Sequence, residues 1–244
     1  MPLQLTNAVR GGIDRATTRT GGILFGVLIF LQFLTIASFN TVLTSIAPPE
    51  AVEQLGLTLP ISGSVAGILL LGTYLVMAVY FVVVARAFAR PVHQLSSIPS
   101  ELYSRRIGRA TLSMIVAGII VFVSIMIGFF LLIIPGIFLS ICFLFFLFVI
   151  GVEDRGVIGS LRQSWDLSRG NRFKLALVVV FLGAIGASVG MIGAIFELAG
   201  VPVIGDVLSI LVNAVLFIFI YGLLADAYLQ LSAESEGETI SNAV

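Results

Sequence analysis

The sequence predicts an all-α, polytopic membrane helix bundle with six transmembrane helices in a single domain of residues 1–244, plus one cytoplasmic interfacial helix. Hydrophobic residues fill 59% of the positions and charged residues only 11%, whereas about a quarter of a soluble domain is charged. The mean hydropathy is +1.14. A chain this apolar cannot cover itself with a polar surface, so hydrocarbon is the solvent that suits it.

Each expected span is an apolar run of the length that crosses about 30 Å of hydrocarbon as a helix. In order, the six spans are expected near residues 21–46, 61–88, 110–134, 137–152, 171–198 and 203–229. Pro48, Pro49, Glu50 and Glu53 close the first span with a polar loop. The first span is longer than the 7–15 residues of a signal-peptide core, so we expect it to stay as an uncleaved anchor.

The third and fourth spans lie in a stretch, 110–152, that contains no charged residue. As one helix this stretch would reach about 65 Å, roughly twice the hydrocarbon thickness. Pro135 and Gly136 lie inside it, and a proline followed by a glycine favours chain reversal. We therefore expect two antiparallel spans joined by a tight turn at Pro135 and Gly136.

The basic residues predict the orientation. All thirteen precede the first span or lie in the loops between spans two and three and between spans four and five. Because Lys and Arg accumulate on the cytoplasmic side of short loops, we expect residues 1–20 and the C-terminus in the cytoplasm, with the chain in the plasma membrane. The acidic, small-residue tail 232–244 is expected to be disordered.

The interfacial helix is expected at residues 157–170. Ile158, Leu161 and Trp165 recur at helical spacing and form an apolar face, and Arg162 can pair with Asp166 one turn later. Gly170 suits the left-handed end of the helix. The alternative is a short connector packed under the bundle.

Cytoplasmic basic residues are the candidates for binding anionic lipid headgroups, because arginines at this level attract lipid phosphates. Trp165 joins them as an aromatic anchor at the headgroup level. The candidate residues are Arg105, Arg106, Arg109, Arg162, Trp165, Arg169 and Arg172.

A family resemblance covers about forty residues, 134–174. It rests on Ile134-Pro135-Gly136-Ile137, the Phe-rich span and the stretch GSLRQSWDLSRGNR at 159–172. These residues resemble the membrane domain joined to bacterial glycerophosphodiester phosphodiesterases and stand-alone six-span proteins of unknown function, most of all haloarchaeal ones. The resemblance implies a six-helix bundle in the plasma membrane. It implies no phosphodiesterase activity, because the catalytic domain of those enzymes is a separate soluble unit.

Small residues in the fifth span predict close helix packing, within the chain or with another subunit or membrane-protein partner. The packing glycines are Gly183, Gly186, Gly190 and Gly193. Ser188 lies in a G-x-S-x-G pattern, but the hydrolase motif needs a strand-to-helix turn and a histidine. The chain's one histidine, His93, is expected in a cytoplasmic loop. An intramembrane serine hydrolase is therefore the least favoured reading.

Few polar residues fall inside the spans, where they usually mark function. Gln32 and Asn213 are candidates for an interhelical hydrogen bond, and Asp226 is expected to pair with a cytoplasmic arginine such as Arg86. No charged residue lies near a span centre. This pattern argues against an ion-coupled transporter.

The chemistry of the chain points away from catalysis. One histidine and one cysteine cannot build a usual metal site, so no metal and no cofactor is expected, and the zero net charge and the lack of aromatic interleaving in the basic loops disfavour nucleic acid. We expect a non-enzymatic scaffold or accessory component that engages anionic lipid or a membrane partner. A carrier for a small apolar or lipid-like solute is the alternative, and it requires a cavity near Gln32 and Asn213.

Overall fold

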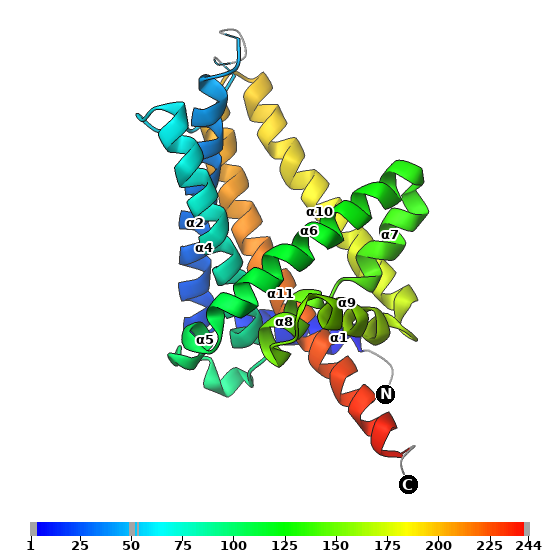
Figure 1. The fold of residues 1–244 in the computed structure, drawn as a ribbon. Coiled ribbons are helices and arrows are strands. Elements are labelled where there is room, and N and C mark those ends of the chain that lie inside the picture. Colours follow the sequence, from blue (N-terminus) through cyan, green and yellow to red (C-terminus); the bar gives the residue numbers. More distant parts are fainter. Residues whose placement is uncertain (1–3, 49–51, 53, 242–244) are drawn as a thin grey trace. The chain divides into compact units, whose positions relative to one another are not determined.

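The computed structural model describes residues 4–48, 52 and 54–241 (Figure 1). All regular structure in these residues is helical, and six segments are long and apolar enough to cross a membrane. This confirms the predicted fold class. The loop residues Pro49, Glu50 and Glu53, and the last three residues of the predicted tail, lie outside the described residues.

The helices follow one another along the chain with short connections. They are α1 Leu5–Ala16, α2 Arg19–Thr44, α4 Gly63–Phe88, the 3-10 turn η1 Val92–Gln94, α5 Glu101–Ser104, α6 Ile107–Leu131, α7 Ile133–Cys142, α8 Phe146–Glu153, α9 Val157–Ser168, α10 Arg172–Leu198 and α11 Pro202–Ser241. The fourth apolar segment, Ile133–Glu153, comprises α7 and α8.

Hydrocarbon is the solvent that the long helices require. In their most apolar windows, between 17% and 44% of the residues are buried inside the chain. Large apolar side chains such as Phe130 (91% exposed) and Ile134 (79% exposed) would otherwise face water. Patches of this kind on a soluble monomer rarely exceed a few hundred Å², so the long helices belong in a membrane.

The chain divides into two compact units. The first unit contains the chain up to Gly22, the segment Ala78–Leu182 and the chain from Ile218 onward. The second unit contains Ile23–Met77 and Gly183–Phe217. Helices α2, α4, α10 and α11 each contribute residues to both units.

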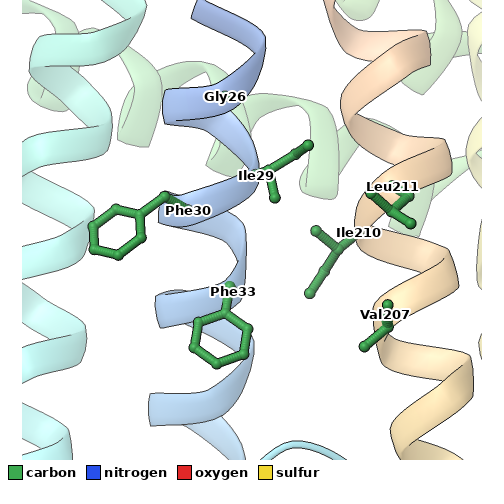
Figure 2. Close-up of a pocket in the computed structure, with 7 residues that line it drawn as sticks. All are labelled: Gly26, Ile29, Phe30, Phe33, Val207, Ile210 and Leu211. Atoms are coloured by element: carbon green, nitrogen blue, oxygen red, sulfur yellow. The ribbon is translucent and has the colours of Figure 1, made fainter.

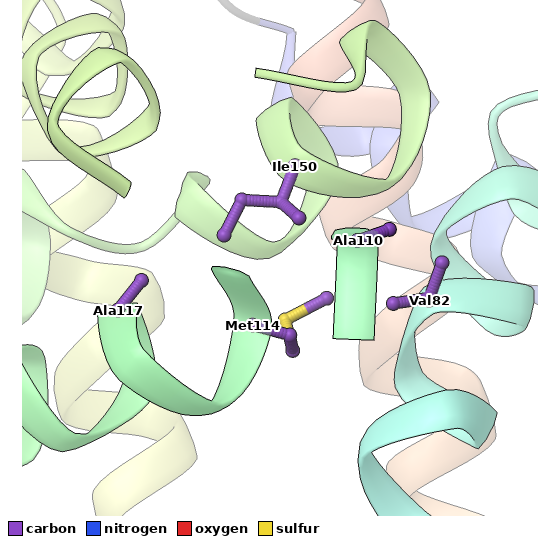
Figure 3. Packing of buried hydrophobic residues seen from close by; sticks show 5 residues of the cluster. All are labelled: Val82, Ala110, Met114, Ala117 and Ile150. Carbon is purple, nitrogen blue, oxygen red and sulfur yellow. The ribbon is translucent and has the colours of Figure 1, made fainter. Parts of the chain in front are cut away.

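The core of the first unit forms where α4, α6 and α8 meet. Figure 3 shows Val82, Met114 and Ile150 directed toward one another, with Ala110 and Ala117 on α6. The small side chains of the two alanines leave room for larger neighbouring side chains to pack against α6. Phe146 and Leu161 pack against the same cluster.

The second unit is held at one end by a polar clamp. The Oδ2 atom of Asp206 on α11 accepts the backbone N–H of Leu57 at 2.8 Å and the Asn40 Nδ2 at 3.2 Å. Asn40 also donates to the Leu57 carbonyl at 3.0 Å. A Cβ at Gly56 would lie 2.1 Å from the same Asp206 oxygen, so glycine is needed where this loop passes the carboxylate.

The α6–α7 hairpin confirms two antiparallel segments but moves the turn. The chain reverses at Leu132, an extended residue (φ −164°, ψ 155°), and not at Pro135 and Gly136. Pro135 instead lies in the first turn of α7, where a missing N–H costs nothing. Gly136 meets α6: a Cβ on Gly128 would lie 2.9 Å from the Gly136 Cα. The two glycines therefore permit close helix contact rather than forming the turn.

Both termini hold more helix than the sequence suggested. Helix α1 precedes the first span, and it crosses α11 where Gly12 and Gly222 touch: a Cβ on Gly222 would lie 2.8 Å from the Gly12 Cα. Helix α11 runs to Ser241. The stretch 232–241, expected to be disordered, is therefore helical.

Candidate functional site

Two buried arginines link the basic segments of the first unit. Arg86 on α4 has a side chain only 6% exposed. It donates from Nε to the Gly151 carbonyl at 2.8 Å, from Nη1 to the Leu102 carbonyl at 3.1 Å, and from Nη2 to Asp154 Oδ1 at 2.8 Å. All three guanidinium nitrogens are satisfied, which offsets the cost of burying the charge.

Asp154 joins two arginines. Its Oδ1 accepts from Arg86, and its Oδ2 accepts from Arg105 Nη2 at 2.6 Å and from Arg105 Nε at 2.8 Å. Asp154 ends α8 in the left-handed conformation (φ 53°), which aspartate tolerates better than most residues. The role of Asp154 could not be predicted from the sequence, because its partners lie 49 and 68 positions away.

Asp226 corrects a predicted pairing. Its Oδ1 receives Arg15 Nη1 at 2.9 Å, and not Arg86. Arg15 also donates from Nε to the Phe88 carbonyl at 2.8 Å, so α1, α4 and α11 meet at this arginine. The sequence correctly predicts that Asp226 pairs with an arginine. It does not identify Arg15 as the partner, because that pairing depends on the crossing of α1 over α11.

The fourth apolar segment is broken between α7 and α8. Ser164 on α9 satisfies backbone groups at this break. Its Oγ donates to the Cys142 carbonyl at 2.9 Å and accepts the Phe145 N–H at 3.1 Å. Cys142, Phe145 and Ser164 are fully buried. A helix break at membrane depth is tolerated only where protein satisfies its backbone, and Ser164 performs this role.

The serines of α9 form its buried face. Ser160, Ser164 and Ser168 are fully buried and recur at four-residue spacing. Ile158, expected on the apolar face of an interfacial helix, is 82% exposed. The expected pairing of Arg162 with Asp166 is also corrected, because Asp166 pairs with Arg169 at 3.5 Å.

The outward face of α9 carries four residues in register: Ile158, Arg162, Trp165 and Arg169 follow one another at spacings of four, three and four. Arg162 and Arg169 are exposed and Trp165 is half-buried. The chain leaves α9 through Gly170, which has the expected left-handed conformation (φ 81°). This face combines apolar and basic side chains, as surface helices on membranes do.

Arg172, the first residue of α10, lies over two aromatic rings that contact each other. Its Cζ is 4.9 Å from the ring centroid of Phe138 and 5.3 Å from that of Trp165. Phe138 and Trp165 meet edge to face, with centroids 5.6 Å apart. The Arg172 Nε has no hydrogen-bond partner among the described residues. This Nε atom is buried, and the two aromatic rings fix the orientation of the guanidinium.

The remaining candidate arginines differ in whether an acidic side chain already binds them. Arg106 and Arg109 are both exposed at the start of α6. Arg106 is the N-cap of this helix, in the left-handed conformation (φ 43°), and Arg109 lies in its first turn. Arg105 is also exposed, but Asp154 holds its guanidinium. The structure therefore brings Trp165 and Arg172 together on the α9 face that carries Arg162 and Arg169.

A polar pair and an apolar groove lie between α2 and α11 in the second unit. Gln32 Nε2 donates to Asn213 Oδ1 at 3.1 Å, so the hydrogen bond considered from the sequence is present. The same two helices line a groove of about 280 Å³ (Figure 2). Its walls are Gly26, Ile29, Phe30 and Phe33 on α2 and Val207, Ile210 and Leu211 on α11.

The glycines of α10 contact little of the second unit. A Cβ at Gly183, Gly186 or Gly190 would meet nothing within 4 Å, whereas a Cβ at Gly193 would lie 3.4 Å from Ser209 Oγ. Ser188 donates to the Ala184 carbonyl of its own helix at 2.9 Å. Among the described residues, no group of three or more His, Cys, Asp or Glu side chains is arranged to hold a metal ion.

These features define a helical integral membrane protein with six candidate spans and a polar, arginine-rich end to its first unit. The chain belongs to the family described as a domain of unknown function, DUF7847, whose profile matches residues 3–231. Comparisons with curated proteins and with solved structures give no match.

Proposed function

We propose that this protein is a non-enzymatic component of the plasma membrane that binds anionic lipid headgroups at its cytoplasmic face. The observation that carries the proposal is the Arg172 guanidinium, which lies over the rings of both Phe138 and Trp165. Stacking leaves the edge of a guanidinium free to donate, and that edge matches the geometry of a phosphate.

The surroundings of Arg172 suit a phosphodiester. Arg162 and Arg169 are exposed on the same face of α9, and they add positive charge near the stacked guanidinium. Arg172 also begins α10, where the first backbone N–H groups and the positive end of the helix dipole favour an anion. Arg106 and Arg109 provide a second, exposed basic segment for the lipid surface.

A scaffold or accessory role follows from this chemistry. Binding and orientation require only fixed charges and a membrane-embedded fold, and the candidate residues offer no nucleophile paired with a base. The resemblance of residues 134–174 to the membrane domain joined to glycerophosphodiester phosphodiesterases supports a partner that acts on membrane lipid. The N- and C-termini would then face the same cytoplasmic partner.

One observation favours the second candidate function, a carrier or binding protein for an apolar solute. That function requires a cavity near Gln32 and Asn213, and the groove between α2 and α11 lies on the helix pair that this hydrogen bond joins. A groove open to the hydrocarbon supports ligand binding more directly than transport.

Native mass spectrometry of the purified protein, titrated with phosphatidylglycerol or phosphatidylcholine, tests the headgroup site. A charge-assisted hydrogen bond contributes about 1.5–3 kcal/mol, so Arg172→Gln should weaken phosphatidylglycerol binding about tenfold or more. Phosphatidylcholine binding should change less, because its headgroup has no net charge.

Arg105→Gln is the matched control. Arg105 is another exposed arginine of the same unit, but its guanidinium is already held by Asp154 at 2.6 Å. The control should keep phosphatidylglycerol affinity. Equal lipid retention by the wild-type protein and the Arg172→Gln variant would contradict the proposal.

A further inference from the structure

The hairpin of α6 and α7 turns through a stretch that has no polar side chain. Residues 129–134 read FFLLII, and the side chains from Phe130 to Ile134 are 67–91% exposed. By contrast, Glu197 and Asp206 flank the turn between α10 and α11. Turns that face water are dominated by Gly, Pro, Asn, Asp and Ser, so the α6–α7 turn is suited to hydrocarbon rather than to water.

Helix α9 marks the edge of the hydrocarbon in the first unit. The side chains of Asp166 and Arg169 on this helix are 51% and 65% exposed, and Arg162 is exposed as well. Charged side chains are costly inside a bilayer and favourable among the headgroups. We therefore place α9 at the level of the headgroups.

Contacts with α9 and α10 hold α7 close to this level. The ring centroid of Phe138 on α7 lies 5.6 Å from that of Trp165 on α9 and 4.9 Å from the Arg172 Cζ. Phe138 is only five residues from Ile133, where α7 begins, a rise of about 7.5 Å. Even the ten residues of the whole helix rise about 15 Å, half of the hydrocarbon thickness. The turn before Ile133 therefore cannot reach the opposite surface.

The first half of α6 also stays near the headgroup level. Helix α6 contacts both α8 and α9. Met114 and Ala117 belong to the buried cluster that contains Ile150 on α8, and Leu161 on α9 packs against the same cluster. Ala117 is the eleventh residue of α6, so in a helix perpendicular to the membrane it would lie about 15 Å below the first residue. Its place in the cluster instead indicates that α6 runs obliquely to the membrane.

The turn contains little irregular backbone, which matters because unpaired backbone groups are costly in hydrocarbon. Leu132 is the only residue between α6 and α7, and its N–H donates to the Gly128 carbonyl at 3.0 Å. Pro135, in the first turn of α7, has no N–H to satisfy. A Cβ on Gly136 would lie 2.5 Å from the ring of Phe129, so α6 covers the start of α7.

We propose that α6 and α7 form a re-entrant hairpin whose apolar tip inserts among the acyl chains of the leaflet on the arginine-rich side and ends near the bilayer centre. Both segments are long and apolar enough to cross a membrane, but the contacts of α7 with α9 and Arg172 limit their depth. The hairpin leaves and returns to the same side, as a pair of full crossings also would. The inference uses the position of Arg172 and not its binding of lipid, so it is independent of the proposed function.

The depth of the tip can be measured with single-tryptophan variants of the full chain in phosphatidylcholine vesicles. Trp165→Phe removes the native tryptophan and keeps an aromatic ring against Phe138, and Phe130→Trp places the probe at a side chain that is 91% exposed. Bromines near the ends of the acyl chains should quench this probe about twofold more strongly than bromines near the glycerol, because the tip lies near the bilayer centre.

Leu198→Trp in the same Trp165→Phe background is the matched control. Leu198 is 89% exposed and ends a helix of 27 residues, which at about 40 Å is long enough to reach the opposite interface. Bromines near the glycerol should therefore quench this control more strongly. The same order for Phe130→Trp would overturn the proposal. Weak quenching of Phe130→Trp by both lipids would show that protein covers the tip and would also overturn it.

Cysteine accessibility separates a re-entrant hairpin from two full crossings. In the Cys142→Ala background, Leu132→Cys should not react with a membrane-impermeant maleimide from either side of the membrane. Ala199→Cys, at an exposed position in the turn after α10, should react from one side. Both variants should react fully after denaturation in detergent, which shows that the thiols are intact. Reaction of Leu132→Cys from either side of the native protein would overturn the proposal.

Discussion

At the scale of single residues, Asp154 is the acidic side chain on which the arginine network most depends. It is 13% exposed and binds both Arg86 and Arg105. Breaking a buried pair by removing one partner costs about 3–5 kcal/mol, because the other charge stays buried without a counter-charge. Asp154→Asn keeps the shape and tolerates the left-handed backbone. We therefore expect this variant to lower the midpoint of thermal unfolding in detergent by many degrees.

The control for this prediction is Asp166→Asn. Asp166 is 51% exposed and lies 3.5 Å from Arg169, and exposed pairs of this kind contribute about 0–1 kcal/mol. The fluorescence of Trp165 reports unfolding in both variants. Similar midpoints for the two variants would show that the Arg86–Asp154 pair does not stabilise the fold.

The sequence identifies residues by type, but it does not identify their partners. Gln32 and Asn213 could be paired because few polar residues fall inside the spans, which leaves few combinations. Asp226 had many basic candidates, and α1, which supplies Arg15, was not recognised as a helix. Ser164 and Asp154 gave no signal, because a serine and an aspartate in a polar segment are ordinary in composition. Their roles arise from distant backbone groups that only the fold brings near.

At the scale of elements, the contact between α6 and α7 depends on Gly128. A Cβ there would lie 2.9 Å from the Gly136 Cα and 3.0 Å from its backbone nitrogen, and backbone atoms cannot move aside as a side chain can. We expect Gly128→Ala to cost about 1–3 kcal/mol despite the better helix propensity of alanine. Gly118→Ala on the same helix meets nothing within 4 Å and should be neutral or stabilising by up to about 1 kcal/mol.

Unfolding midpoints in detergent, measured by circular dichroism at a helical wavelength, would compare the two α6 variants. A lower midpoint for Gly118→Ala than for Gly128→Ala would refute the predicted contact.

Apolar length predicts the spans well, whereas it predicts their interruptions poorly. The six expected segments agree with the observed helices because the hydrocarbon thickness sets a minimum length. Pro135 and Gly136 predict a turn because proline usually ends a helix, but a proline in the first turn of a helix does not interrupt it. The gap after Cys142 had no sequence signal, since it depends on Ser164 from another helix.

At the scale of the whole molecule, the ion pairs bear on the topology of the first unit. Arg105 precedes α6 and Asp154 follows α8, yet they lie 2.6 Å apart. The chain between them must leave and return to the same level, as a hairpin does and a single crossing does not. From the charge distribution we expect this level to face the cytoplasm.

Cysteine labelling in intact cells tests that assignment. In a Cys142→Ala background, which removes the one native cysteine, Gln54→Cys lies in the loop between the first two spans and Glu101→Cys lies between α4 and α6. Both native residues are exposed. Because Glu101 is on the arginine-rich side and Gln54 is one span away from it, a membrane-impermeant maleimide should label Gln54→Cys in intact cells and Glu101→Cys only after permeabilisation. Labelling of both positions from outside would contradict the single crossing, by α4, that separates them. Labelling of Glu101→Cys alone would invert the orientation while keeping the six spans.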